Sequence, residues 1–214
     1  MDQPLAELLA ADLDGSFENL VREHQDRLYG LAFRYVGSAT DAEDLAQDAF
    51  VRAYRALARY EPARIRDLDL RPWLTTILLN VCRNHLARPA RRVSAHTTSV
   101  DEATLLTADS HGEPEAHANR REAAERWARL VADVPQLYRA VVLLRHLDGM
   151  SYQEMSVVLG RPEGTLKAQV HRGVDLLRAA FEADERSRTQ QPPGQPAPTP
   201  RLTTRRAPAV EANP

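Results

Sequence analysis

Residues 151–172 read SYQEMSVVLGRPEGTLKAQVHR, and this stretch decides the fold of the chain. Ser151 and Glu154 have the spacing of a capping box, in which the serine side chain caps the glutamate amide and the glutamate reaches back to the serine. Gly160 is a natural stop for the short helix that follows. A tight turn through residues 161–164 then leads into a second helix. Two helices joined by a tight, glycine-containing turn are typical of a helix-turn-helix.

The second of these helices carries polar side chains on its predicted outer face: Lys167, Gln169, His171 and Arg172. Lysine and arginine suit phosphates and guanine edges, glutamine suits adenine, and histidine can contact either. This combination near the beginning of a helix favours reading of a DNA major groove. The alternative, from the residues alone, is an ordinary helical hairpin with a solvated basic face.

Apolar residues continue this pattern on both sides of the stretch, at steps of three and four residues. Upstream, Pro135 is predicted to open a helix that Gly149 ends. The inward positions of that helix are predicted to be Leu137, Val141, Leu144 and Leu147. The inward positions of the last helix are predicted to be Leu166, Val170, Val174 and Leu177. Together these helices predict a small helical domain.

The first part of the chain shows three more helical patterns. The first begins at Ser16, a plausible N-cap, and ends at Gly37. The second is capped by Ser38 or Thr40 and has acidic residues in its first turn, where the helix dipole favours them. The third runs over residues 73–87 after a proline-punctuated loop at residues 60–72.

The chain is therefore predicted to be all-α, with two small helical domains joined by a flexible linker, the second domain containing the helix-turn-helix. The predicted segments are a leader at 1–15, a first domain at 16–88, a linker at 89–118, a second domain at 119–183 and a tail at 184–214. The linker has no sustained apolar period. Seven of the 14 prolines fall in residues 187–214, so the tail is predicted to be disordered.

A second informative segment spans residues 41–48 and reads DAEDLAQD. Asp41, Asp44 and Asp48 share one face of the predicted helix by their spacing. The residues alone leave three readings open: a solvated first turn favoured by the helix dipole, a surface that docks another protein, and a metal or acid–base site. Magnesium would need a substrate phosphate nearby, and the sequence contains no glycine-rich phosphate loop.

Composition limits the remaining possibilities. The formal net charge of the 214 residues is −2, so any nucleic-acid surface must be local. Cys82 is the only cysteine, which excludes an intramolecular disulfide and a cysteine-based zinc site. No apolar run reaches the roughly 18–20 residues of a membrane span, and the acidic beginning lacks the features of a signal peptide. We therefore predict a cytoplasmic protein.

Taken together, these segments resemble the extracytoplasmic-function (ECF) group of bacterial RNA polymerase sigma factors, in the sigma-70 family. Residues 41–50 (DAEDLAQDAF) and 53–57 (AYRAL) are similar to the polymerase-docking helix of that family. Residues 71–84 (RPWLTTILLNVCRN) resemble its promoter-melting helix. Residues 147–155 (LDGMSYQEM) and 164–172 (GTLKAQVHR) resemble its C-terminal helix-turn-helix. The ECF group keeps only these two domains, in this order.

The resemblance implies a factor that binds core RNA polymerase, directs promoter-specific initiation, and is not an enzyme. It implies no cofactor, no metal and no membrane insertion, and three partners: core polymerase, promoter DNA as duplex and melted strand, and an anti-sigma protein. The matched polymerase-binding positions are Asp41, Glu43, Asp44, Gln47 and Asp48. The matched minus-ten positions are Trp73, Asn80, Arg83 and Asn84, with a flipped base received by the loop at 60–72. The matched minus-thirty-five positions are Glu163, Thr165, Lys167, Gln169, His171 and Arg172.

Two other functions remain to be weighed against this one. A plain DNA-binding regulator would use only the helix-turn-helix, but the acidic helix and the helix that follows Trp73 argue against it. An enzyme would use the three aspartates of residues 41–48 as metal ligands, yet no nucleophile–base pair or histidine cluster accompanies them. Trp73 itself has an alternative role in core packing.

Overall fold

The computed structural model describes residues 2–87 and 114–189, with side chains from residue 4 to 87 and from 122 to 189. Every regular element in these ranges is a helix, which confirms the all-α prediction. The helices are α1 (Asp2–Ala11), α2 (Leu13–Val36), α3 (Ala39–Leu57), α4 (Pro62–Arg66), α5 (Leu70–Ala87), α6 (Pro114–Asp133), α7 (Gln136–Val142), the π-helix η2 (Leu143–Leu147), α8 (Tyr152–Leu159) and α9 (Glu163–Thr189). Most of the predicted linker and tail lies outside the described residues.

We call α1–α5 (residues 2–87) the first half of the chain and α6–α9 (residues 114–189) the second half. Helix α2 is the centre of the first half, and α3 and α5 pack along it. It is capped by Asp12, whose carboxylate accepts the Gly15 N–H at 3.0 Å. The predicted cap at Ser16 is therefore wrong: Ser16 lies inside the helix and its hydroxyl donates to the Leu8 carbonyl at 3.2 Å. Asp12 reaches a free amide in the first turn, whereas Ser16 lies one turn farther on, where the amide is already bonded to the Asp12 carbonyl.

The turn between α2 and α3 has the predicted chemistry. Gly37 ends α2 with φ of 78°, in the left-handed region that glycine adopts without steric cost. Ser38 then caps α3, because its hydroxyl accepts the Asp41 N–H at 3.3 Å. Local capping thus sets the direction in which the acidic helix leaves α2.

Two segments predicted to lack structure form helices that pack against each other. The predicted leader contains α1, and the predicted loop at 60–72 contains α4. Leu5 and Leu9 of α1 and Ile65 of α4 are buried, and Arg66 pairs with Glu7 at 3.0 Å. Each segment is too short to show a clear apolar period in the sequence. Both are helical because their apolar side chains are buried against each other. Helix α5 begins at Leu70, three residues before the predicted position.

In the second half, the residues before Gly149 that face inward differ in part from the predicted ones. Of the four predicted inward leucine and valine positions before Gly149, Val141 and Leu144 are buried, whereas Leu137 and Leu147 are 42% and 44% exposed. The helix changes to π geometry over η2, and the Asp148 N–H bonds to the Leu143 carbonyl five residues back. This wider turn brings Asp148, not Leu147, to the inner side.

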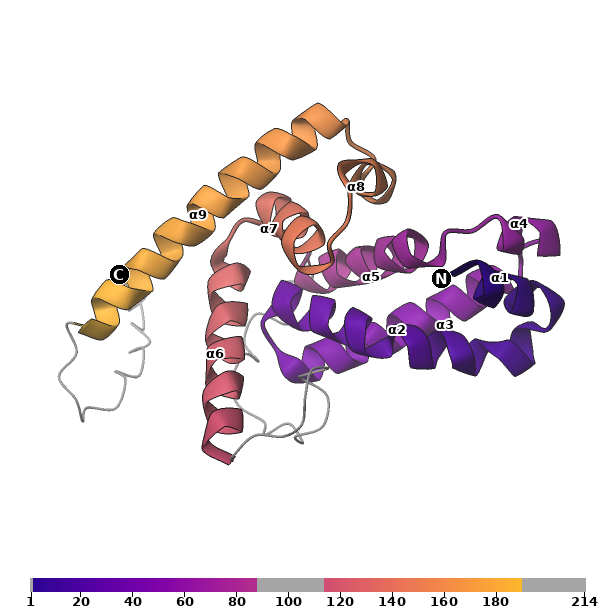
Figure 1. Ribbon diagram of the computed structural model, residues 1–214, viewed down its shortest axis with the longest axis horizontal. Helices are drawn as coiled ribbons and strands as arrows, with labels where there is room; N and C mark the ends of the chain where they lie inside the picture. Colours follow the sequence, from indigo (N-terminus) through magenta and orange to yellow (C-terminus); the bar gives the residue numbers. More distant parts are fainter. Residues whose placement is uncertain (1, 88–113, 190–214) are drawn as a thin grey trace, which may run out of the picture.

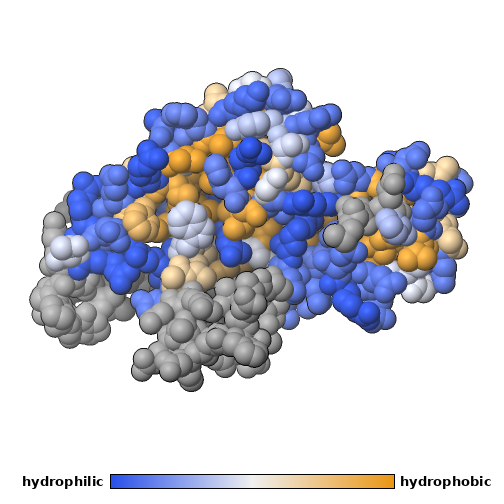
Figure 2. Space-filling model, in the orientation of Figure 1, coloured by the Kyte–Doolittle hydropathy of each residue, from blue (hydrophilic) through white to orange (hydrophobic). Residues whose placement is uncertain are grey.

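The two halves of the chain pack on each other (Figure 1). Helix α6 stands across the end of α2, and α8 lies over α5. Buried residues of both halves, such as Leu28 and Leu144, belong to one continuous hydrophobic core. Figure 2 shows apolar surface gathered over α7, between α6 and α9. No helix in the described ranges is both long and apolar enough to cross a membrane.

Candidate protein and nucleic-acid interfaces

The acidic helix α3 presents a polar side to solvent and buries the other. Ala42, Leu45 and Ala49 face the core, so the polar residues between them lie on the outer side, as the 3.6-residue period requires. Glu43, Asp44 and Gln47 are exposed. These three side chains are the most exposed part of the predicted docking surface, and we call them the α3 acidic face.

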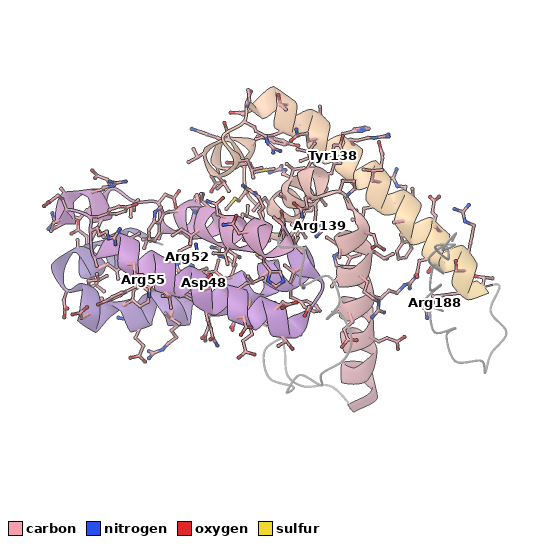
Figure 3. The ribbon with its side chains drawn as sticks, turned by 180° about the vertical axis from the view of Figure 1, so that it is seen from behind. Asp48, Arg52, Arg55, Tyr138, Arg139 and Arg188 are labelled. Carbon is pink, nitrogen blue, oxygen red and sulfur yellow. The ribbon has the colours of Figure 1, made fainter. Side chains whose placement is uncertain are left out.

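The other two predicted docking residues are held by neighbours. Asp41 is half-buried, and its Oδ2 lies 3.6 Å from Nε2 of His85 at the end of α5. Asp48 accepts a hydrogen bond from Nε of Arg52 at 3.0 Å, one turn along α3 (Figure 3). That carboxylate raises the pKa of Arg52 above its ordinary value. Within the described ranges, no group of three or more His, Cys, Asp or Glu side chains is arranged to hold a metal ion.

Helix α5 carries a row of polar side chains on one side. Asn80 and Asn84 follow Trp73 by seven and eleven residues, so all three lie along one line of the helix. Both asparagines are exposed and Trp73 is half-buried. Arg83 is half-buried beside this row and donates to Oδ1 of Asn80 at 3.2 Å. The structure therefore brings the four predicted minus-ten positions onto one side of α5.

Tyr60 and Arg64, which the sequence analysis did not name, lie next to Trp73 at the beginning of this row. The rings of Tyr60 and Trp73 have centroids 6.2 Å apart, and the guanidinium of Arg64 stands 3.7 Å from the Tyr60 ring centroid. The two ring planes are tilted by 57°. Aromatic rings and guanidinium planes are the groups on which unpaired bases stack. Pro62, in the first turn of α4, was the only local signal that this segment is ordered.

The helix-turn-helix forms with the predicted caps. The Ser151 hydroxyl accepts the Glu154 N–H at 3.2 Å, and the Glu154 carboxylate accepts the Ser151 N–H at 2.6 Å. These bonds lower the pKa of Glu154. Gly160 ends α8 with φ of 64°. Gly173 of α9 allows close packing on α7, since a Cβ there would lie 2.5 Å from a methyl group of Val142.

The beginning of α9 exposes most of the predicted base-reading side chains. The exposed residues are Glu163, Thr165, Lys167, His171 and Arg172. Gln169 is half-buried, and its Oε1 accepts from Arg161 at 3.0 Å. The ammonium of Lys167 lies 5.5 Å from the Tyr152 ring centroid, and His171 Nδ1 lies 3.2 Å from Asp175. Arg161 and Tyr152 thus position side chains of this surface, a role that sequence reasoning did not assign to them.

Cys82 has no place in any of these surfaces. Its side chain is 1% exposed in the core of the first half, and burial raises the pKa of the thiol to about 12. Such a thiol is unreactive at neutral pH. Cys82 therefore packs as a small apolar residue, as the sequence suggested.

Comparisons with known proteins show the family of the chain. Residues 20–92 match the family described as Sigma-70 region 2, and residues 124–177 match Sigma-70, region 4. The ECF RNA polymerase sigma-E factor of Escherichia coli K12 is 30% identical over 182 residues, covering 82% of this chain and 92% of that protein. The ECF sigma factor SigE of Mycolicibacterium smegmatis is 34% identical over 164 residues, covering 76% of this chain and 60% of that protein.

Two solved structures share the fold. CnrH, solved in complex with the cytosolic domain of CnrY, aligns with a TM-score of 0.63 and 26% identity, covering 86% of this chain and 98% of that chain. The sigma factor RpoE of Bartonella quintana, solved with the anti-sigma factor NepR, aligns with a TM-score of 0.58 and 20% identity, covering 78% and 98%. The second likeness concerns the fold alone.

Proposed function

This chain belongs to the ECF group of the bacterial sigma-70 family, and on that premise we propose that its three exposed polar surfaces serve three separate contacts in transcription initiation. It binds core RNA polymerase, directs transcription from specific promoters, and is an initiation factor rather than an enzyme. We call Asn80 and Asn84 the asparagine row of α5. The observation that carries the proposal is that the α3 acidic face, the asparagine row of α5 and the beginning of α9 are all exposed, on separate helices.

The α3 acidic face is the proposed contact with core polymerase. Its exposed side chains are negatively charged or amide groups, and the exposed Val51 lies one turn after Gln47, whereas Ala42, Leu45 and Ala49 are buried. A surface of this kind suits a basic partner, because complementary charge steers association and fixes orientation. Asp44 lies at the centre of the face, between Glu43 and Gln47, and is therefore the residue on which the contact most depends.

The asparagine row of α5 is the proposed contact with the melted strand at the minus-ten element. Exposed amides of Asn80 and Asn84 present both donors and acceptors, which match the edges of unpaired bases. The group of Tyr60, Trp73 and Arg64 lies at the beginning of the row, and we assign to its rings the base that is taken out of the duplex. We assign Arg83, half-buried beside the row, to the backbone phosphate.

The beginning of α9 is the proposed reader of the duplex minus-thirty-five element. Its exposed Lys167, His171 and Arg172 lie on the second helix of the helix-turn-helix, the element that such motifs place in the major groove. Gln169 is oriented by Arg161 and supplies an amide to the same surface. We assign Glu163 and Thr165, in the first turn, to the edge of this contact.

Control by an anti-sigma protein completes the proposal. CnrH was solved with the cytosolic domain of CnrY, and RpoE of Bartonella quintana with the anti-sigma factor NepR. The apolar surface over α7 is a suitable target in this chain, since the helices around it carry the exposed Trp127, Leu137 and Phe181. We place the protein in the cytoplasm because its polymerase and promoters are there.

Transcription in vitro tests the proposal directly. Sigma-free core polymerase is mixed with the purified chain and a genomic library, and the 5′ ends of the transcripts are mapped. We expect start sites that share one spaced pair of sequence elements, and none of these start sites with core polymerase alone. Random initiation in the presence of the chain, with every bound inhibitor removed, would refute the assignment.

A plain DNA-binding regulator is the remaining competitor, and competition for core polymerase separates the two. We expect the chain to displace a labelled housekeeping sigma factor from core polymerase in a concentration-dependent way. A plain regulator would leave that complex intact.

A further inference from the structure

Helix α1 lies outside the part of the chain that matches Sigma-70 region 2, since that match begins at residue 20. It nevertheless packs against α4, the short helix that carries Arg64. Figure 1 shows α1 and α4 together at one end of the first half, beyond the beginning of α5. We call Tyr60, Arg64 and Trp73 the base-receiving group. A helix that is not part of the matched region therefore contacts the segment that holds one member of this group.

Helix α4 does not hold its own position. It has five residues, and a helix of this length is marginal without tertiary contacts. Glu61, at its N-cap, makes no side-chain capping bond. The backbone bonds of α4 are local: the Ile65 N–H donates to the Glu61 carbonyl at 3.2 Å, and the Asp67 N–H to the Ala63 carbonyl at 3.3 Å. These bonds form the turn, but they do not decide which way it faces.

Three consecutive side chains of α4 make three different contacts. Ile65 is buried in the hydrophobic core. Nε of Arg66 donates to Oε2 of Glu7 in α1 at 3.0 Å. The guanidinium of Arg64 stands 3.7 Å from the ring centroid of Tyr60. Consecutive side chains of a helix point about 100° apart, so the contacts of Ile65 and Arg66 fix the direction of Arg64.

Helix α1 is itself fixed to α2. Leu5 and Leu9 lie one turn apart and are both buried, and Ala6 between them is fully buried and allows close packing. The Ser16 hydroxyl of α2 donates to the Leu8 carbonyl at 3.2 Å, at the end of α1. Since α1 packs against both α2 and α4, it connects the central helix of the first half to the base-receiving group.

We propose that α1 positions Arg64 and thereby sets the base preference at the minus-ten element. This inference rests on the proposed function, in which the base-receiving group takes up an unpaired base. Aromatic rings stack on every base and discriminate little among them. The guanidinium of Arg64 has donors in a fixed fork, which distinguish one base edge from another. Leu5, Glu7 and Leu9 are thus positioning residues that act on the base through α4.

The base preference is measured by transcription in vitro with core polymerase and the full chain. The template is one promoter recovered from the genomic library, made in four versions that carry each base at one minus-ten position. The position chosen is the one at which the wild-type chain discriminates most. We define the preference ratio as the transcript yield from the best base divided by the mean yield from the others.

Leu9→Ala tests the apolar contact of α1. We expect the preference ratio to fall by about fivefold, because a good arginine contact to a base edge gives at least about that much discrimination. Leu31→Ala is the matched control. It removes the same group at an equally buried position about 27 Å along α2 from Leu13. It should keep the wild-type ratio even if it lowers the yield from all four templates.

A charge exchange tests the contact between α1 and α4 without a change in the core. Glu7→Arg places a like charge beside Arg66, and we expect it to lower the preference ratio by about twofold. Glu7→Arg combined with Arg66→Glu restores opposite charges and should restore the ratio. Both residues are exposed, so neither substitution is expected to unfold the chain.

The fluorescence of Trp73 reports the geometry of the base-receiving group directly. The chain has two tryptophans, and Trp127→Phe leaves Trp73 as the only one. Trp73 is half-buried, with its ring centroid 6.2 Å from that of Tyr60. We expect Leu9→Ala in this background to shift the emission to longer wavelength, because water gains access to the indole. Leu31→Ala in the same background should leave the emission unchanged.

A wild-type preference ratio in a folded Leu9→Ala variant would overturn the proposal, as would an equal loss of the ratio in Leu31→Ala. If Leu9→Ala loses helix content by circular dichroism, the charge exchange decides, and a wild-type ratio in Glu7→Arg would then overturn the proposal. Failure of the proposed function is distinguishable, since the wild-type chain would direct no initiation from any of the four templates.

Discussion

Nε2 of His85 lies 3.6 Å from Oδ2 of Asp41, and this contact joins the end of α5 to the beginning of α3. It connects the helix proposed to bind the melted strand with the helix proposed to bind polymerase. Asp41 is therefore directed toward its own chain, although its spacing had grouped it with Asp44 and Asp48. The α3 acidic face holds the more exposed side chains of this helix, whereas Asp41 also contacts His85.

Asp44→Arg is predicted to abolish core polymerase binding and to leave the fold intact. The substitution reverses one charge at the centre of the α3 acidic face, and loss of a buried interface charge pair costs at least about 2 kcal/mol, or about thirtyfold in affinity. Competition with a labelled housekeeping sigma factor measures the affinity. Asp41→Asn is the control and should retain most of the binding, because Asp41 faces His85. Equal effects of the two substitutions would contradict the division between these carboxylates.

Lys167→Ala and Arg172→Ala are each predicted to weaken binding to minus-thirty-five duplex in the complex with polymerase. If the side chain neutralises one phosphate, its loss reduces the salt slope of log affinity by about 1. Promoter binding across a series of potassium chloride concentrations gives that slope. Arg178→Ala, at an exposed position farther along α9, should change it little. A salt slope that stays at the wild-type value in both variants would show that these cations do not meet the phosphates.

Gly37→Ala is predicted to destabilise the chain by about 1–2 kcal/mol, since an L side chain is strained at a φ of 78°. The added methyl group also meets Ala132 of α6. Urea unfolding followed by circular dichroism measures the loss. Gly164→Ala is the matched control: a Cβ there meets nothing within 4 Å, and its backbone is not left-handed. It should be neutral or slightly stabilising, and an equal loss in both variants would contradict this account.

Cys82 is predicted to resist a thiol reagent at pH 8 in the native chain and to react fully in urea. Burial raises the pKa of the thiol to about 12, so almost no thiolate is present at pH 8. Because the folded pKa lies above the unfolded value of about 8.5, the contribution of this group to stability is complete below pH 8.5 and is lost as the pH rises toward 12. Cys82→Ala should lack that part of the alkaline decline. Rapid native labelling would show that the thiol is accessible.

The sequence by itself determined the elements whose signals are local. The capping box of Ser151 and Glu154 and the stop at Gly37 each depend on bonds that reach only three or four residues, so their residue types alone reveal them. The same is true of the exposed side of α9, because the period of a helix assigns inner and outer positions. The cap of α3 is equally local, but the sequence left Ser38 and Thr40 as alternatives and the structure shows Ser38. Family resemblance then supplied roles that spacing does not contain.

Only the tertiary structure decided which polar groups are available and how the halves meet. Nη1 of Arg27 lies 2.8 Å from Oδ1 of Asp148, although the two residues are 121 residues apart in sequence and nothing local to either residue indicates the other. The π turn before Asp148, the mutual burial of α1 and α4, and the contact of Asp41 with His85 likewise arise from packing between distant segments. Burial and charge pairing depend on the position of every neighbour, whereas caps and helix periods depend on a few adjacent residues, and this difference in range separates what could be predicted from what could not.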